Sequence, residues 1–453
     1  MSQPEHVTES ELNRFYRGEL SASESRRVVR HLLTGCPSCR ARSSGRWQAE
    51  VVPIRPDDED GFDEIFERAA QASIRLGNTI ENERRAAPVL LAELLRHPFE
   101  RQKLLVANSP RFQSYGLVEA LVEAAFRGGF HDPIQAIDQA DLAVTIADGI
   151  SAETYGERIV NDLQARAWGT LGNAQRIASR LLDAENSLRR GFDLAGRGTG
   201  DPTERARLLS FLASLRSDQL RFDEALTLHQ EMTMIYETLG DRHMLGRTTE
   251  QMAFVLRRKG DFQKAIKYSE RALADLDPER DLRAVMVARQ GLANALFEVG
   301  RFEEASTQCV GLRREWTELG NELDAIRCNW TLGKILHRQG QLRQAEARFS
   351  NIRDRFVELE IPYDAALVSL DLAETLFDQG RTAAMSRRLA EAIPMFRDLG
   401  IHREAIAALA FLKQAAELEQ VSARLIRATA RFVEESRKNP ELRFRSTALS
   451  TDG

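Results

Sequence analysis

The sequence has few cysteines and lacks a long apolar run. Its 4 cysteines in 453 residues are too few for a disulfide-built scaffold. It holds no run of about 18 apolar residues, the length that a membrane-spanning helix needs. Its first residues, MSQPEHVTES, lack the basic segment and apolar core of a secretory signal. We therefore expect a cytoplasmic protein with no membrane partner.

Neither sign of charge dominates the composition. The chain has 63 Lys and Arg against 68 Asp and Glu, a net charge of −5, which disfavours nucleic acid as a partner. Hydrophobic residues make up 43% and charged residues 29%, so the chain has enough apolar surface to fold.

Motifs for catalysis are missing as well. Gly333-Lys334 lacks the upstream glycine and the following Ser or Thr of a phosphate-binding loop, and neither H-E-x-x-H nor G-x-S-x-G occurs. Cys309 and Cys328 fall within helical patterns, where a cysteine usually serves as a small buried hydrophobe. We therefore expect no enzymatic activity.

What the sequence does contain is a repeat of 40 residues. Glycines in turn signals recur at this spacing, at Gly260, Gly300, Gly340 and Gly380. A small residue stands seven positions before each of them, at Ala253, Ala293, Gly333 and Ala373. Such small residues let the two helices of a hairpin approach to ~8 Å. A fixed period of this length predicts stacked helix hairpins whose usual output is a binding surface.

The repeat resembles the tetratricopeptide repeat, with its W-x2-L-G…A-x3-F…A spacing. Three units match, at Trp168, Leu171, Gly172, Ala184 and Leu188, at Leu209, Ala213 and Ala225, and at Asn329, Leu332, Gly333, Ala345 and Phe349. The alanine anchors recur at Ala184, Ala225, Ala265, Ala305 and Ala345, and Met385 replaces the next one. The spacing resembles the long tetratricopeptide units of bacterial regulators, and the resemblance covers roughly residues 110–433.

The sequence thus predicts an all-α protein, a small zinc-binding helical module followed by an α-solenoid of tetratricopeptide-like helix hairpins. The predicted segments are the zinc module (1–46), a linker (47–62), a helical lead-in (63–110), the solenoid (111–433) and a disordered tail (434–453).

The N-terminal module combines two helix starts with a cysteine knuckle. Thr8 with Glu11 and Ser21 with Glu24 form capping boxes, which predict two short helices. The following Cys36-x2-Cys39 is a common source of two zinc ligands, and His6 and His31 can complete the tetrahedral set. So small a module also gains stability from a metal. The alternative is that the histidines are ordinary surface residues and the cysteines bind nothing.

This module resembles the N-terminal zinc-finger of bacterial anti-sigma factors. The matching positions are Phe15, Gly18-Glu19-Leu20, His31-Leu32 and Cys36-Pro37-x-Cys39. The spacing from His31 to Cys36 is one residue longer than the family pattern, and a linker stands where that family often has a membrane span. The resemblance implies a zinc cofactor and makes a sigma factor a candidate partner.

In the tetratricopeptide family the first helix of each hairpin lines a concave groove. Carried over to this sequence, the groove positions are Arg166, Asn173, Arg176, Arg247, Phe254, Arg257, Asn294, Phe297, Arg327, Trp330, Lys334, His337, Glu374 and Phe377. The cations would favour an acidic peptide or a C-terminal carboxylate, and the aromatics would supply apolar anchors. The alternative is that the aromatics pack between repeats and the arginines are solvated.

These features favour a non-catalytic protein-binding regulator or scaffold, in which a zinc-stabilised module precedes a groove for a protein or peptide. One specific form is cytoplasmic, anti-sigma-like regulation. The alternatives are a pure assembly scaffold with structural zinc and a ligand-sensing helical solenoid.

Overall fold

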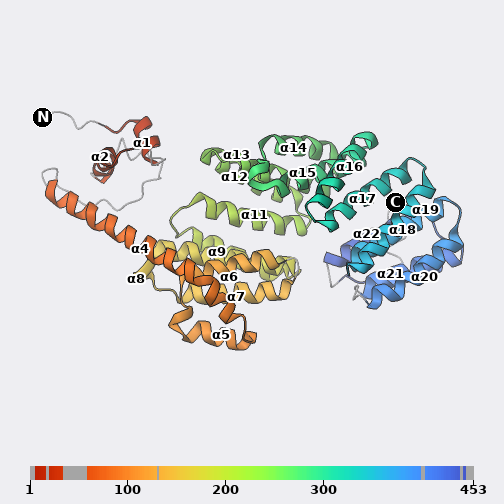
Figure 1. Ribbon diagram of the computed structural model, residues 1–453, viewed down its shortest axis with the longest axis horizontal. Coiled ribbons are helices and arrows are strands. Elements are labelled where there is room, and N and C mark those ends of the chain that lie inside the picture. The colour runs from red at the N-terminus through yellow and green to blue at the C-terminus, as the bar shows by residue number, and fades with distance from the viewer. Residues whose placement is uncertain are drawn as a thin grey trace. The chain divides into compact units, whose positions relative to one another are not determined.

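The computed structural model describes residues 6–16, 20–33, 59–129, 132–398, 403–438 and 442–444, and the regular structure among them is entirely helical (Figure 1). The chain divides into two compact units, Met1–Ala87 and Pro88–Gly453, which are described separately. The division falls within α4 (Glu59–Leu94). This helix begins inside the segment predicted as a linker, which was expected to extend to residue 62. Among the described helices, none is both long and apolar enough to cross a membrane.

The N-terminal module contains the two predicted short helices, α1 (Glu9–Tyr16) and α2 (Ala22–Leu33). Both predicted capping boxes are present. The backbone N–H of Thr8 donates to the Glu11 carboxylate at 2.9 Å, and that of Ser21 donates to Glu24 at 2.8 Å. The core between the helices is small, with buried Val7, Leu12, Val28 and Leu32 flanked by Phe15 and Leu20.

The second unit begins with helices that precede the regular repeats. These are α5 (Phe99–Asn108), the short 3-10 helix η1 (Pro110–Phe112), α6 (Tyr115–Gly128), α7 (Pro133–Gly149) and α8 (Ala152–Tyr155). Helix α7 packs against α5, α6 and α9, and so joins this segment to the repeats.

Six helix hairpins then follow one another along the chain (Figure 1). The first helices of the hairpins are α9 (Glu157–Ile177), α11 (Pro202–Asp218), α13 (Arg242–Lys259), α15 (Pro278–Glu298), α17 (Glu322–Arg338) and α19 (Pro362–Asp378). The second helices are α10 (Leu181–Ala195), α12 (Phe222–Leu239), α14 (Phe262–Asp275), α16 (Phe302–Glu318), α18 (Leu342–Glu358) and α20 (Thr382–Asp398). Each second helix packs on its own first helix and on the next one, which makes a solenoid.

Left-handed turns set the period of the solenoid. The four repeat glycines adopt φ between 71° and 86°, a conformation that a side chain disfavours. After Gly260, the N–H of Asp261 bonds back to the Leu256 carbonyl at 2.9 Å, a Schellman closure of the first helix. Gly240 and Gly320 adopt the same conformation between hairpins. At three equivalent turns, Ser179 (φ 62°), Leu220 (φ 61°) and Glu360 (φ 55°) do so without being glycine.

The small residues of the repeat lie where the helices of each hairpin cross, as predicted. Ala253, Ala293 and Ala373 are buried, as are the alanine anchors of the second helices. Gly333 occupies the same position on α17. A Cβ atom there would approach the Phe349 ring to 2.6 Å, so the large ring requires the glycine.

One first helix is interrupted near its start. Within α15, Asp281 has φ −155° and ψ 83°, and its carboxylate accepts the Ala284 N–H at 2.9 Å, as an N-cap does. Regular helix therefore resumes at Leu282, 40 residues after Arg242 begins α13 and 40 before Glu322 begins α17. The kink at Asp281 thus keeps the 40-residue spacing between first helices, although α15 already begins at Pro278.

The last two helices depart from the repeat. Helix α21 (Arg403–Glu417) packs on α20, but α22 (Ala423–Lys438) packs on both α21 and α19. Helix α22 therefore packs back on α19, the first helix of the last regular hairpin. Its Ile426 and Val433 are buried in the core that α18 and α19 share.

The predicted disordered tail is wrong at its start. Helix α22 continues through Lys438, because Val433 and Ser436 face the interior and are at most 2% exposed. Beyond it, the Phe444 ring lies 5.5 Å from the Phe432 ring and 5.8 Å from the Phe411 ring, measured between centroids. Apolar contacts thus order residues that the polar sequence around them assigned to a tail.

Candidate functional site

The first helices α13, α15, α17 and α19, the start of α14 and the helix α22 line a groove of 790 Å³. Seven of the predicted groove residues line it, namely Phe254, Arg257, Asn294, Phe297, Arg327, Trp330 and Lys334. The remaining lining residues are Arg258, Phe262, Gln290, Glu298, Thr331, Asp364, Leu367, Asp371, Ala430, Arg431 and Glu434. The groove therefore spans α13 to α19, and α22 contributes to its lining.

The three predicted aromatic residues that line the groove differ in how far they face solvent. Phe254 is 51% exposed, whereas Phe297 is only 9% exposed and contacts the Phe302 ring at a tilt, with centroids 5.9 Å apart. Trp330 is half-buried and meets Phe356 edge to face, with ring centroids 5.8 Å apart. Phe297 thus packs within the solenoid, while about half of Phe254 is exposed, and the Arg257 guanidinium lies 5.7 Å from the centre of its ring.

Acidic residues one repeat further along the chain neutralise the groove cations. The Arg327 guanidinium lies 3.2 Å from the Asp364 carboxylate, and Lys334 Nζ lies 3.8 Å from Asp371. These pairs join α17 to α19, the next first helix. Charge recognition of an acidic peptide would have to compete with these internal partners.

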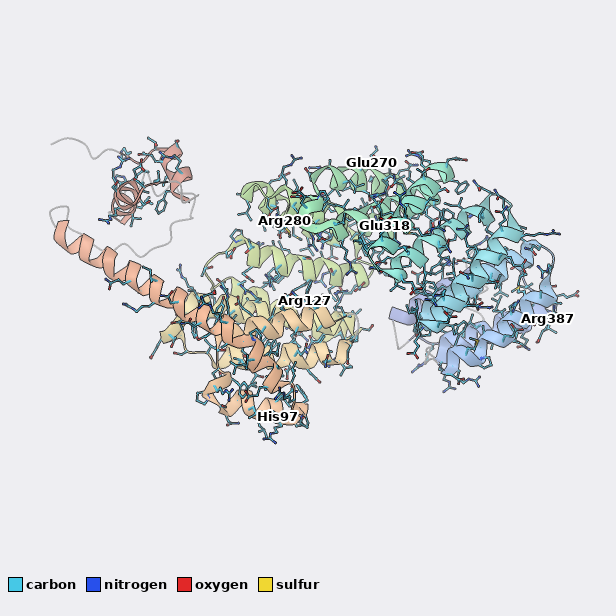
Figure 2. All side chains as sticks on the ribbon, viewed as in Figure 1. His97, Arg127, Glu270, Arg280, Glu318 and Arg387 are labelled. Atoms are coloured by element: carbon cyan, nitrogen blue, oxygen red, sulfur yellow. The ribbon has the colours of Figure 1, made fainter. Side chains whose placement is uncertain are left out.

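The same pairing continues at both ends of α13. Arg247 lies 3.2 Å from Asp281 of α15, and Arg258 donates to Asp218 of α11 at 2.9 Å. Arg280, labelled in Figure 2, donates to both carboxylate oxygens of Asp241. Ion pairs between neighbouring repeats thus fix the stacking of the hairpins as well as the groove charge.

Three predicted groove residues lie in a separate polar network between α9 and α11. Arg166 binds Glu119 at 2.8 Å and also pairs with Glu204. Burial alone would lower the pKa of Arg166, but hydrogen bonding to Glu204 outweighs it and raises the pKa above its usual value. Arg176 binds Asp218 at 2.6 Å and the buried side chain of Asn173. None of the three lines the groove.

The remaining predicted positions lie at the C-terminal side or in the core. His337 Nε2 lies 2.9 Å from the Asp378 carboxylate. Glu374 is covered by α22 and pairs with Arg427 at 3.1 Å, and burial raises its pKa. Phe377 packs against the core rather than lining the groove.

Sequence reasoning missed the acids of the groove and the return of α22. Asp364 and Asp371 lie 37 residues after Arg327 and Lys334, which is one helical turn short of the 40-residue repeat, so a search for acids at that spacing could have found them. Ala430, Arg431 and Glu434 carried no such signal, because α22 lies outside the 40-residue period.

In the N-terminal module, two of the predicted zinc ligands lie side by side. The rings of His6 and His31 meet edge to face with centroids 5.8 Å apart. Burial lowers the pKa of His31, and the nearby His6 and Arg27 lower it further, which favours the neutral imidazole that a metal binds. Cys36 and Cys39, the other predicted ligands, lie outside the described residues.

The two cysteines of the solenoid are buried, as predicted. Burial raises the pKa of both the Cys309 and the Cys328 thiol to about 12, so neither forms a thiolate nucleophile at neutral pH. Within the described parts of the chain, no cluster of three or more His, Cys, Asp or Glu side chains could hold a metal ion.

Comparison with known structures gives matches to helical repeat proteins. A Rap protein complexed with Competence and Sporulation Factor is 15% identical with a TM-score of 0.51, over 72% of this chain and 88% of that one. Aspartyl phosphate phosphatase F from Bacillus subtilis is 12% identical with a TM-score of 0.50, over 87% and 96%. NprR in complex with its cognate peptide NprX is 13% identical with a TM-score of 0.46, over 68% and 85%. At these identities the similarity to the first two structures shows the fold alone.

Comparison with curated protein sequences gives no match. The model of the tetratricopeptide repeat family matches residues 204–277, which span α11, α12, α13 and α14. The match covers two hairpins whose geometry recurs along the solenoid. The chain therefore contains tetratricopeptide repeats.

Proposed function

We propose that this chain is a non-catalytic regulator or scaffold that binds an extended, mainly apolar peptide segment of a partner protein in the groove between α13 and α22. The observation that carries this proposal is the exposed Phe254 ring in a groove where four of the five lining cations already pair with acids. Aromatic side chains in such positions are the usual anchors of protein interfaces.

The balance of charge in the groove favours an apolar segment over an acidic one. The lining contains five cations and four acids, namely Arg257, Arg258, Arg327, Lys334 and Arg431 against Glu298, Asp364, Asp371 and Glu434. Because Asp364 and Asp371 hold Arg327 and Lys334, little net attraction is left for a carboxylate. The acidic peptide predicted from the sequence is thus less well supported than an apolar one.

Polar side chains in the groove suit an extended backbone. The Gln290 and Asn294 amides lie on α15 beside the aromatic residues, and an amide both donates and accepts. These groups can bond the N–H and C=O groups of a peptide while Phe254 and Trp330 contact its side chains. The solved Rap protein, which shares the fold, is complexed with Competence and Sporulation Factor, which is consistent with such a role.

A photocrosslinking pair tests the groove. Benzoylphenylalanine would replace Phe254, which is 51% exposed in the groove, or Met234, which is 59% exposed on α12 and does not line it. After irradiation in cells, we expect a discrete crosslinked protein at position 254 and none at position 234. The same product at both positions, or no product at position 254, would contradict groove binding.

We further propose that the N-terminal module holds one structural zinc ion through His6, His31, Cys36 and Cys39. The support is the edge-to-face contact of the two histidines and the small core of four buried apolar side chains. Bound zinc would tie the end of α2 to the segment before α1 and so stabilise a module that this core stabilises only weakly.

Metal analysis of the full chain tests this second proposal. We expect one equivalent of zinc per chain, lost in Cys36→Ser/Cys39→Ser and kept in Cys309→Ser/Cys328→Ser. A full chain that folds without metal would exclude the zinc ion.

A sigma-factor partner rests on the resemblance of residues 6–39 alone. We test it by asking whether a crosslinked sigma factor is lost in Cys36→Ser/Cys39→Ser.

A further inference from the structure

A second pocket, of 440 Å³, lies between the hairpins α15–α16 and α17–α18 and shares no residue with the groove. Its apolar wall consists of Phe302, Val310, Leu332, Ile335 and Leu336. Two arginines line it from facing second helices, Arg313 on α16 and Arg348 on α18. We infer that this pocket binds a small amphiphilic monocarboxylate.

The two arginines differ from most arginines of the solenoid because neither has a carboxylate partner in the part of the chain that the structure describes. Arg348 is half-buried, and its guanidinium donates at 2.6 Å to the side-chain oxygen of Asn329, a neutral acceptor. Among the described residues, no carboxylate lies within ion-pairing distance of Arg313 or Arg348. Burial lowers the pKa of Arg348, and the charge of Arg313 lowers it further. A half-buried charge without a counter-ion is costly, and an anionic ligand would remove that cost.

The repeats supply an internal comparison for this pair. One repeat later, the equivalent Arg353 and Arg388 have carboxylate partners, Asp354 at 2.6 Å and Glu391 at 3.0 Å. One repeat earlier, Leu273 and Gln308 occupy the two positions. That earlier seam has a pocket of 330 Å³, but its Arg301 pairs with Glu304 at 2.6 Å. The cationic pair without acids is therefore a property of the seam between α16 and α18.

The other lining groups narrow the class of ligand. Glu303 also lines the pocket, so the two arginines leave one net positive charge, which matches a monoanion better than a phosphate dianion. The Ser306 hydroxyl and the Gln339 amide can complete the hydrogen bonds of a carboxylate. The apolar wall suits an alkyl or aryl body. The volume lies in the lower part of the range of about 300–1,000 Å³ for small-molecule sites.

Titration of the full chain with three probes of equal chain length tests the ligand class. Decanoate, decan-1-ol and decyl phosphate would be added below their micellar concentrations, with binding followed by calorimetry and by the unfolding temperature. We expect decanoate to bind and to raise the unfolding temperature, decanol to have no effect, and decyl phosphate to bind more weakly. Equal binding of decanol, tighter binding of decyl phosphate, or no binding of decanoate would overturn the assignment.

Variants then locate the site. Arg348→Gln introduces the residue that the preceding repeat has at this position, so we expect it to fold and to weaken decanoate binding at least about tenfold. The matched control is Arg388→Gln, which removes the equivalent but paired arginine and should leave decanoate affinity unchanged. Unchanged affinity in a folded Arg348→Gln chain, or an equal loss in Arg388→Gln, would contradict the site. This inference is independent of peptide binding in the groove.

Discussion

The Trp330 indole N–H donates a hydrogen bond to the Asp371 carboxylate, which lies 41 residues further on in the next first helix. Lys334, one turn after Trp330, places its ammonium group 4.7 Å from the centre of the same indole ring and 3.8 Å from the same carboxylate. Asp371 thus orients an aromatic anchor and neutralises a cation at once. Acidic side chains on the next first helix therefore set the charge and the aromatic geometry of the groove, and with them the kind of peptide that it can bind.

Removal of these acids is expected to change the preference of the groove. In Asp364→Asn/Asp371→Asn, Arg327 and Lys334 lose carboxylate partners that hold them at 3.2 and 3.8 Å. Arg327 keeps Asp324 at 3.2 Å, so Lys334 is the cation that is freed. We expect affinity for an acidic peptide to rise by up to about tenfold at low salt and to fall again with added salt, because salt screens the freed charge. Fluorescence anisotropy with a labelled acidic peptide measures this change.

The control for that experiment is Asp354→Asn, which removes an acid that pairs with Arg353 and does not line the groove. It should not change acidic-peptide binding. A wild-type chain that already binds the acidic peptide as tightly as the double variant would show that the groove cations are not neutralised.

Leu220→Gly is expected to stabilise the protein. Leu220 adopts φ 61°, is 68% exposed, and stands where other hairpins have glycine. Relief of its left-handed strain should raise the free energy of unfolding by up to about 1 kcal/mol. Gly260→Ala, at φ 86° in the equivalent turn, should lower it by a similar amount. Urea denaturation measures both, and changes of the same sign would refute a conformational cause.

The crossing of α17 and α18 depends on the pairing of a glycine with a large ring. A Cβ at position 333 would lie 2.6 Å from the Phe349 ring, so we expect Gly333→Ala to lower the free energy of unfolding by about 1–3 kcal/mol. The hairpin before it has Ala293 opposite the smaller Cys309. Gly333→Ala/Phe349→Cys should therefore lose less stability than the two single changes add up to. Strict additivity in this double-mutant cycle would exclude the steric account.

A buried histidine should make stability fall with acid. His229 is 3% exposed, and burial lowers its pKa to about 4, below the value of about 6.5 for an unfolded chain. The unfolded state therefore binds a proton first. The stability present above pH 6.5 is lost as pH falls from about 6.5 towards 4, by an amount on the order of 3 kcal/mol.

Urea midpoints measured between pH 7 and pH 4 test the role of His229. His229→Gln should flatten this dependence, whatever its effect on stability at pH 7. His97→Gln, which changes a half-buried histidine in the turn after α4, is the control and should leave the slope as it is. An unchanged slope in His229→Gln would assign the acid sensitivity to other groups.

The repeat could be predicted from sequence because its signals are local. Gly260 and Ala253 satisfy conformational and steric requirements that few other residues meet, so their spacing revealed the hairpins. Leu220 and Glu360 adopt the same turn without the residue that announces it. Those two turns could be inferred only because they lie one repeat length from turns that do contain glycine.

The candidate site was predictable only in part. Position within the first helix selected Phe254 and Trp330, which line the groove, but it also selected Phe377, which packs against the core. Residue type alone could not show that Asp364 and Asp371 neutralise Arg327 and Lys334, because this depends on how closely α19 stacks beside α17. Nor could the amphipathic pattern of α22 predict that it packs on α19, because an apolar face indicates burial but not which helix covers it.

Peptide affinity measured on matched variants tests the central claim most directly. A peptide selected from a random library on the full chain would be titrated against the wild type, Phe254→Ala, Trp330→Ala and Met234→Ala. The account predicts an apolar or aromatic peptide whose binding weakens at least about tenfold in Phe254→Ala and Trp330→Ala and is unchanged in Met234→Ala. Equal affinity for all four proteins would contradict recognition in the groove.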